Sequence, residues 1–140
     1  MENDDILEAD ENMLARFGWQ QEREAFLQYL ENTHHIIQEI VRHHISSPNE
    51  QVYAVMKRSE WFFGTFNVCI PIAVGGRQQR LLLRCPLPHR FHTERAPDLA
   101  AEKLRTEAAS FAWLSRYCSR VPIPMLRGFG LPNGLSVSCQ

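Results

Sequence analysis

The chain has 140 residues, of which 44% are hydrophobic and 22% charged, a composition close to that of average globular proteins. This length suits one domain, and the composition excludes collagen-like, coiled-coil and disordered classes. Apolar runs such as Leu81–Leu83 fall far short of the roughly 20 residues that cross a bilayer, and the acidic N-terminus is unlike a secretory or mitochondrial leader. The four cysteines lack CxxC spacing, which predicts reduced, mostly buried thiols. We expect a soluble, cytoplasmic protein with no membrane partner.

The net charge of −1 conceals a division along the chain. Residues 1–60 contain 12 acidic and 5 basic side chains, whereas residues 61–140 contain 4 acidic and 10 basic ones. Nine of those ten cations are arginines, which suit bidentate contacts with phosphate. The basic half therefore indicates either a phosphate-bearing ligand or a solvated face that the acidic half balances.

The first 50 residues predict an acidic helical region. Residues 1–19 have the pattern of a short amphipathic helix or docking arm, with Leu14, Phe17 and Trp19 as its apolar positions. Residues 20–44 contain no Gly or Pro and place apolar residues at helical spacing. This predicts one long helix, or two that join near Asn32–Thr33, with an end at Ser46–Asn49.

Residues 52–85 change to a strand pattern. Val52–Phe63 is expected to form a strand that ends before a tight loop at Gly64–Thr65. Two further strands, 66–74 and 77–85, are expected to pair antiparallel around a two-residue turn at Gly75–Gly76.

Prolines and glycines divide the rest of the chain. Pro86 and Pro88 are expected to stop the third strand and to begin a loop over residues 86–96. A helix is predicted over residues 97–118, since Pro97 and Asp98 suit its first turn. Turn signals follow it at Gly128, Gly130, Pro132 and Asn133–Gly134.

Glu107 interrupts the apolar stripe of the predicted helix. The stripe consists of Ala100, Leu104, Phe111, Leu114 and Cys118. A carboxylate on a core-facing stripe needs a partner, because an unpaired buried charge costs several kcal/mol. In the third strand Arg80, Leu82 and Arg84 point away from Leu81, Leu83 and Cys85. Arg84 is thus the expected partner in a buried ion pair; the alternative is a surface Glu107 paired with Lys103, four residues earlier.

Four blocks of sequence resemble the aminoglycoside phosphotransferase family, in its fungal branch. They are Gly64–Pro71 (GTFNVCIP), Leu82–Pro88 (LLRCPLP), Glu102–Ala109 (EKLRTEAA) and Val121–Gly130 (VPIPMLRGFG). The resemblance covers roughly residues 55–135 and implies an α+β fold: a kinase-like N-terminal lobe in which a small, twisted antiparallel sheet packs on one helix. Residues 1–50 would then be the acidic helical region and residues 51–140 an incomplete lobe.

The resemblance also implies a nucleotide site. The residues it assigns are the covering-loop residues Gly64, Thr65, Phe66 and Asn67, the phosphate-binding Arg84, and Glu107, which would orient Arg84. Full-length relatives would transfer the γ-phosphate of ATP to a hydroxyl of a small molecule. We expect weak or no ATP binding, and no phosphoryl transfer, by this chain alone.

Phosphoryl transfer also needs an aspartate base and Mg²⁺ ligands from a second lobe. None of the six histidines is followed two residues later by aspartate, and only ten residues follow Gly130. We therefore expect no catalytic residue, and no Mg²⁺ held by this chain alone. The alternative function is a non-enzymatic interaction module, in which the open sheet edge binds the missing C-terminal lobe or another protein.

Other motifs favour ordinary structural roles. The run of Glu31, His35, Glu39 and His43 spreads its histidines over about 12 Å of helix, too far for one metal ion. Another run, Cys85, His89 and His92, lacks a fourth ligand nearby. The aromatic residues Trp61–Phe63 indicate core packing rather than base stacking, so no nucleic-acid partner is expected.

Overall fold

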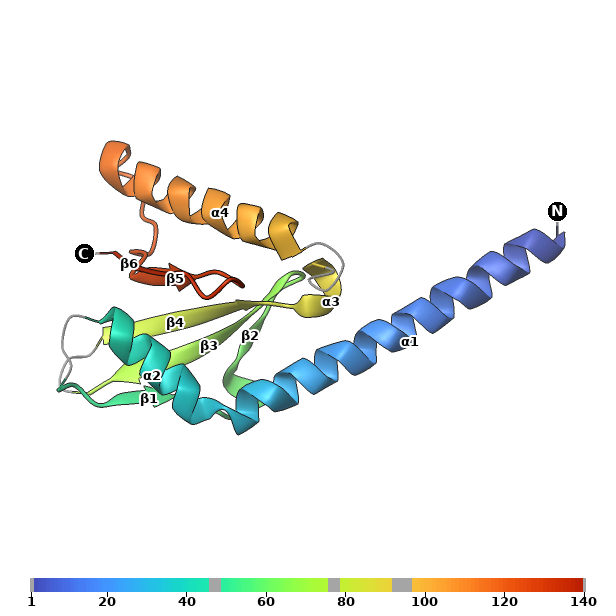
Figure 1. Cartoon of the computed structure of the whole chain (residues 1–140), viewed down its shortest axis with the longest axis horizontal. Helices are drawn as coiled ribbons and strands as arrows, with labels where there is room; N and C mark the ends of the chain where they lie inside the picture. The colour runs from blue at the N-terminus through green and yellow to red at the C-terminus, as the bar shows by residue number, and fades with distance from the viewer. Residues whose placement is uncertain (1, 46–48, 76–78, 92–96, 140) are drawn as a thin grey trace.

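The computed structural model describes residues 2–45, 49–75, 79–91 and 97–139, and it confirms an α+β fold (Figure 1). The helical elements are α1 (Glu2–Asn32), α2 (His34–His44), α3 (Pro88–Phe91), α4 (Pro97–Tyr117) and the 3-10 turn η1 (Arg58–Glu60). The strands are β1 (Val52–Ala54), β2 (Phe62–Phe63), β3 (Asn67–Val74), β4 (Gln79–Pro86), β5 (Gly128–Gly130) and β6 (Ser136–Ser138). Within the described residues, no helix combines the length and apolar character needed to cross a bilayer.

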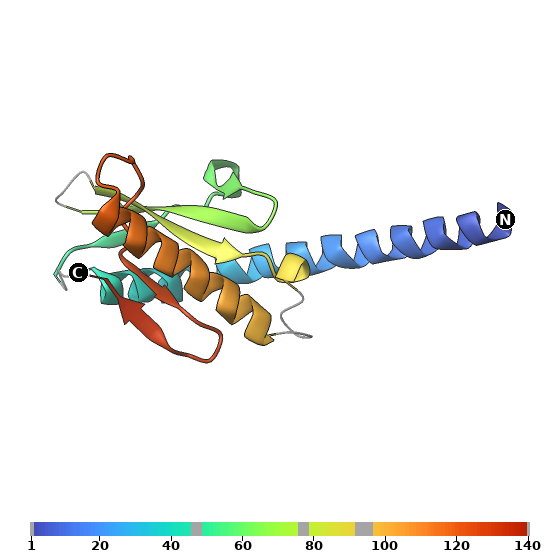
Figure 2. The same cartoon turned by 90° about the horizontal axis from the view of Figure 1, so that it is seen from above.

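Thr33 separates the two N-terminal helices, so the second of the two predicted alternatives is confirmed. Its backbone N–H and its hydroxyl both donate to the carbonyl of Tyr29, at 3.0 and 2.7 Å, and so end α1. Its own carbonyl accepts from Ile36 and Ile37 and so begins α2. The first helix is longer than the short helix expected for residues 1–19, and its N-terminal end projects well away from the sheet (Figures 1 and 2). The expected end at Ser46–Asn49 lies mostly outside the described residues.

Strand β3 is the centre of a four-stranded antiparallel sheet. It pairs with β4 along its whole length, from Asn67 opposite Pro86 to Val74 opposite Gln79. Four residues therefore separate the paired ends, rather than the two that the sequence predicts; residues 76–78 are outside the described part. Gly75 does not adopt the left-handed conformation that the predicted turn requires. Its N–H donates to the carbonyl of Gln51, at 2.7 Å.

The other edge of β3 carries β1 and β2 in succession, so the single strand predicted over Val52–Phe63 is wrong. The cause is Pro71, which accepts a hydrogen bond from the N–H of Val55 at 2.9 Å but has no N–H to return. The carbonyl of Val55 accepts from the indole Nε1 of Trp61 instead. After Val55 the chain therefore stops pairing with β3, forms η1 and pairs with β3 again at Phe62.

Helices α1 and α2 cover the core face of the sheet. The buried cluster consists of Leu27, Leu30, Ile37, Val41, Val52, Trp61, Val68, Ile70, Ile72 and Leu87. The expectation that the sheet packs on the helix at 97–118 is therefore wrong for the core. The apolar stripe of α4 is only half-buried, whereas α1 and α2 bury Leu27, Leu30, Ile37 and Val41.

Helix α4 lies beyond β4, at the edge of the sheet away from β1 (Figure 1). Its bounds agree with the prediction of a helix over 97–118. The segment before it differs from the predicted loop, because Pro88–Phe91 forms the short helix α3, which packs against α1. Residues 92–96 lie outside the described part.

A C-terminal hairpin, β5–β6, docks on the end of α2. Its turn contains Gly134 at φ 85°, a backbone region that favours glycine, as the predicted turn requires. Gly128 and Gly130, expected in turns, lie in β5. The His44 ring lies against Gly128, with Nδ1 2.8 Å from Ser138 Oγ and Nε2 3.0 Å from Ser136 Oγ. Burial, followed by the charge of His43, lowers the pKa of His44, so the neutral ring is favoured.

The hydrogen bond from Trp61 to Val55 gives a stability prediction. Trp61→Phe leaves the Val55 carbonyl without its donor and should cost about 2 kcal/mol in chemical denaturation. Trp113→Phe, at a tryptophan that is 56% exposed on α4, is the matched control and should cost less than about 0.5 kcal/mol. Pro71→Val restores an N–H opposite Val55, so Trp61→Phe should cost less in that background; an equal cost in both backgrounds would contradict the assignment.

The contact between His44 and Gly128 gives a second prediction. A Cβ at residue 128 would overlap His44 Nδ1 and come within 2.8 Å of the Val137 carbonyl oxygen. Gly128→Ala should therefore cost about 1–3 kcal/mol and increase amide exchange in β5 and β6. Gly64→Ala is the control, because its nearest atom is an ordinary 3.6 Å away, and it should cost no more than about 0.5 kcal/mol. Equal effects from the two substitutions would disprove the docking.

Candidate functional site around Arg84

Arg84 lies on the outer face of β4, away from the core. It is opposite Cys69 of β3, whereas Leu83 and Cys85 are opposite the buried residues Ile70 and Val68. The predicted alternation of β4 is therefore confirmed. The guanidinium Nη1 of Arg84 lies 3.4 Å from Glu107 Oε2 on α4, so the predicted ion pair forms and links the sheet to the helix.

Asn67 is the third member of this cluster. It lies diagonally across from Arg84, because Asn67 pairs with Pro86 and Cys69 pairs with Arg84. In the amide orientation that satisfies both its oxygen and its nitrogen, the Asn67 oxygen accepts from Arg84 Nη2 at 2.8 Å and from Nε at 3.2 Å. Asn67 and Glu107 therefore fix the guanidinium from two directions.

The residues before Asn67 form the tight connection between β2 and β3. Gly64 donates its N–H to the carbonyl of Asn67 at 2.9 Å, so this amide is already used within the turn. Thr65 is exposed, and among the described residues its N–H has no acceptor. The ring of Phe66, which is 46% exposed, carries the ammonium of Lys103 at 4.5 Å from its centroid. All six predicted residues therefore lie on or beside the β2–β3 turn, the end of β4 and the facing part of α4.

The ion pair is more exposed than the sequence predicts. The side chain of Arg84 is 46% exposed and that of Glu107 is 34% exposed. The apolar stripe of α4 does face inward, but its five residues are only half-buried, and Ala108 is the one buried residue among those described in this helix. Because α1 and α2 occupy the core face, α4 rests on the sheet only loosely and the pair keeps contact with water.

A cavity of about 290 Å³ opens beside the pair. Its lining residues are Arg84, Thr106, Glu107, Ser110, Phe111, Leu114 and Ile123. The hydroxyls of Thr106 and Ser110 donate to helix carbonyls, at 2.9 Å each, and so present their oxygens beside the guanidinium. Sequence reasoning did not place Lys103, Thr106 or Ser110 in the site; the signal for them is their helical spacing around Glu107.

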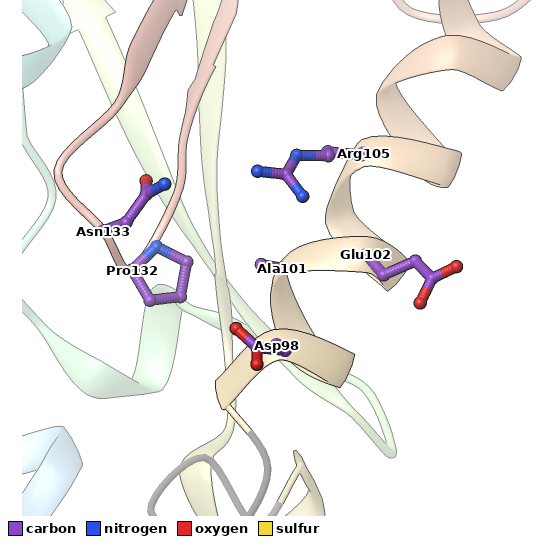
Figure 3. A pocket seen from close by; sticks show the side chains of 6 residues that line it. All are labelled: Asp98, Ala101, Glu102, Arg105, Pro132 and Asn133. Atoms are coloured by element: carbon purple, nitrogen blue, oxygen red, sulfur yellow. The ribbon is translucent and has the colours of Figure 1, made fainter.

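A second cavity, of about 520 Å³, lies between the start of α4 and the β5–β6 turn. Figure 3 shows Arg105 and Asp98 pointing toward Pro132 and Asn133, whereas Glu102 points away from them. The cavity has side chains of both signs, so it has no clear preference for ligand charge.

The thiols near Arg84 are poor nucleophiles. Burial raises the pKa of Cys69, against the opposing effect of Arg84. Burial also raises the pKa of Cys85 to about 12, with a further contribution from Cys69. All four cysteines are free, as predicted, but they are half-buried rather than mostly buried.

The possible metal runs do not converge in the described part of the chain. No group of three or more His, Cys, Asp or Glu side chains there is arranged to hold a metal ion. His92, the last member of the Cys85–His89–His92 run, lies outside the described residues.

Comparison with protein-family models, with curated proteins and with solved structures gives no significant match for this chain.

The exposure of the Arg84–Glu107 pair determines the effect of removing it. Glu107→Ala should lower the free energy of unfolding by less than about 1 kcal/mol, as is usual for solvated pairs. A double-mutant cycle with Arg84→Ala measures the coupling, and Glu102→Ala on the exposed side of α4 is the control. A loss of about 3–5 kcal/mol would instead indicate a buried pair.

Proposed function

We propose that this chain is the nucleotide-phosphate-side lobe of a kinase-fold protein similar to aminoglycoside phosphotransferases. The observation that carries the proposal is the ion pair between Arg84 on β4 and Glu107 on the next long helix. Kinase-like folds use a strand cation and a helix glutamate in this way to hold the α- and β-phosphates of ATP. The turn at Gly64–Asn67 lies beside the pair, where a nucleotide-covering loop would be.

The chemistry of Arg84 suits this role. Glu107 and Asn67 engage its Nη1, Nη2 and Nε atoms, which leaves at least one N–H on each terminal nitrogen for a phosphate oxygen. The pair is also open to solvent, so a phosphate can approach without burying a charge. Glu107 neutralises part of the arginine's charge, and we therefore expect weak nucleotide binding.

The residues of this proposal bind and orient phosphate. They include no group assigned to accept the proton of an attacking hydroxyl. Transfer of the γ-phosphate of ATP to a small-molecule hydroxyl is accordingly proposed for full-length relatives, where a second lobe would supply an aspartate base and the Mg²⁺ ligands.

One observation favours a second candidate, a protein-interaction module. Among the described residues, no strand pairs with the outer edge of β4, which is eight residues long. Leu82, in the middle of β4, is 59% exposed on the outer face. An unpaired edge of this kind accepts an added strand from a partner.

Nucleotide titration followed by NMR tests the first candidate. ADP should shift the signals of Arg84 and of the turn at residues 64–67, with a Kd on the order of 1 mM, or about 4 kcal/mol of binding free energy. Arg84→Gln should weaken binding at least about tenfold, because charge-assisted bonds to phosphate are lost. Arg80→Gln is the matched control, since Arg80 is exposed on the same face of the same strand.

Two results would contradict the nucleotide function: no shift near Arg84 up to about 10 mM ADP, or equal losses in the Arg84 and Arg80 variants. A strand-shaped peptide partner that protects the amides of β4 from exchange would then favour the interaction module.

A further inference from the structure

A basic pocket lies where α1 passes α3, away from the Arg84 cluster. Its volume is about 540 Å³, and its lining residues are Arg16, Trp19, Gln20, Arg23, His89 and Arg90. The first four come from α1 and the last two from α3, two helices that pack against each other. None of the six side chains carries a negative charge.

Within the described part of the chain, no acid forms an ion pair with the arginines of this pocket. Arg23 lies over the ring of Phe63 at 5.0 Å and Arg90 over the ring of Trp19 at 5.9 Å. Neither these two nor Arg16 forms an ion pair with a residue that the structure describes. Arg58 differs from them, because its guanidinium lies 2.7 Å from Glu24 and 2.9 Å from Glu31. Glu24 and Glu31 of α1 therefore pair with Arg58 and not with the arginines of the pocket.

His89 adds a buried polar group to the lining. It is 7% exposed, and its Nδ1 has no hydrogen-bond partner among the described residues. Burial lowers the pKa of His89, and Arg90 and Arg23 lower it further against the opposing charge of Glu22. A buried nitrogen without a partner is costly, and the residue that carries it lines the pocket beside the arginines.

We propose that this pocket binds a small molecule bearing a phosphate or a similar tetrahedral dianion, held by Arg16, Arg90 and His89. Arginine forks match tetrahedral oxyanions, and a lining that contains Arg16, Arg23 and Arg90 but no acid favours a doubly charged ligand. Trp19, which is 38% exposed, adds an aromatic surface on which the organic part of a phosphate ester can stack.

The site goes beyond the proposed nucleotide function. Arg84 projects from the outer face of the sheet, whereas α1 belongs to the layer that covers the core face. The two sites share no residue, so either can be lost without the other.

Sulfate is the first probe, because its charge does not change between pH 5.5 and 8. Binding is measured by calorimetry and by the change in tryptophan fluorescence, at constant ionic strength set with chloride. Arg16→Gln and Arg90→Gln should each weaken sulfate binding about tenfold, and Gln keeps the helix propensity of the replaced residue. Arg120→Gln, at an exposed arginine after α4, should bind sulfate like the unchanged protein.

Equal losses in the Arg120 and Arg16 variants would mean general charge screening and would overturn the proposal. So would an unchanged affinity in both the Arg16 and Arg90 variants, provided that their circular dichroism matches that of the unchanged protein.

The titration of His89, followed by NMR of its ring, gives an independent test without any substitution. A bound dianion favours the imidazolium, so saturating sulfate should raise the pKa of His89 and sulfate should bind more tightly as the pH falls from 7.5 to 6. The other charged groups around His89 are Arg16, Arg23, Arg90 and Glu22. A His89 titration that sulfate leaves unchanged would overturn the proposal.

Comparison of phenyl phosphate with inorganic phosphate tests whether the ligand of this pocket is an organic phosphate or the free anion. Tighter binding of phenyl phosphate, lost in Trp19→Ala, identifies an organic phosphate as the ligand. Equal binding of the two identifies the free anion, and both results support the site. Binding of neither, at concentrations up to about 20 mM, would overturn it.

Discussion

The side-chain alternation of β3 determines the arrangement of the rest of the molecule. Val68, Ile70 and Ile72 are almost completely buried, and this face attracts the apolar stripes of α1 and α2. The residues between them face the other side of the sheet, and so do the β4 residues with which they pair. Arg84 pairs with one of them, Cys69, and therefore faces α4. A shift of one residue in this pairing would move Arg84 into the core, so the burial of β3 and the position of the ion pair depend on the same register.

The charge division along the sequence does not correspond to two faces in space. The acidic N-terminal half supplies Arg16 and Arg23 to a pocket that Arg90, from the basic half, completes. Acids of the same helix instead neutralise Arg58, at the start of η1. The basic half supplies Arg84, which an acid of α4 balances in part. Net charges of long segments therefore conceal where cations converge without partners.

Local patterns allowed the helices and the long hairpin to be predicted, and non-local effects account for most errors. The break at Thr33, the bounds of α4 and the Arg84–Glu107 pair follow from residues close in sequence or from alternation along a strand. The break in the edge strand depends on a missing N–H in a different strand, at Pro71, which periodicity within Val52–Phe63 cannot show. The basic pocket needs the packing of α3 on α1, and no spacing in the sequence relates these segments. Gly128 did carry a signal, because a glycine within a strand often marks the close approach of another group.

The contact of His44 with the C-terminal hairpin has a consequence for folding. Its two hydrogen bonds join residues 94 and 92 positions apart, so the end of α2 reaches its final environment only after Ser136 and Ser138 have been made. The helices and the β3–β4 hairpin rely on nearer partners and can form first. During synthesis the apolar core can therefore assemble while the ring of His44 is still in water. The docking of β5 and β6 on that ring would then follow the assembly of the core and couple this hairpin to the packing of α2.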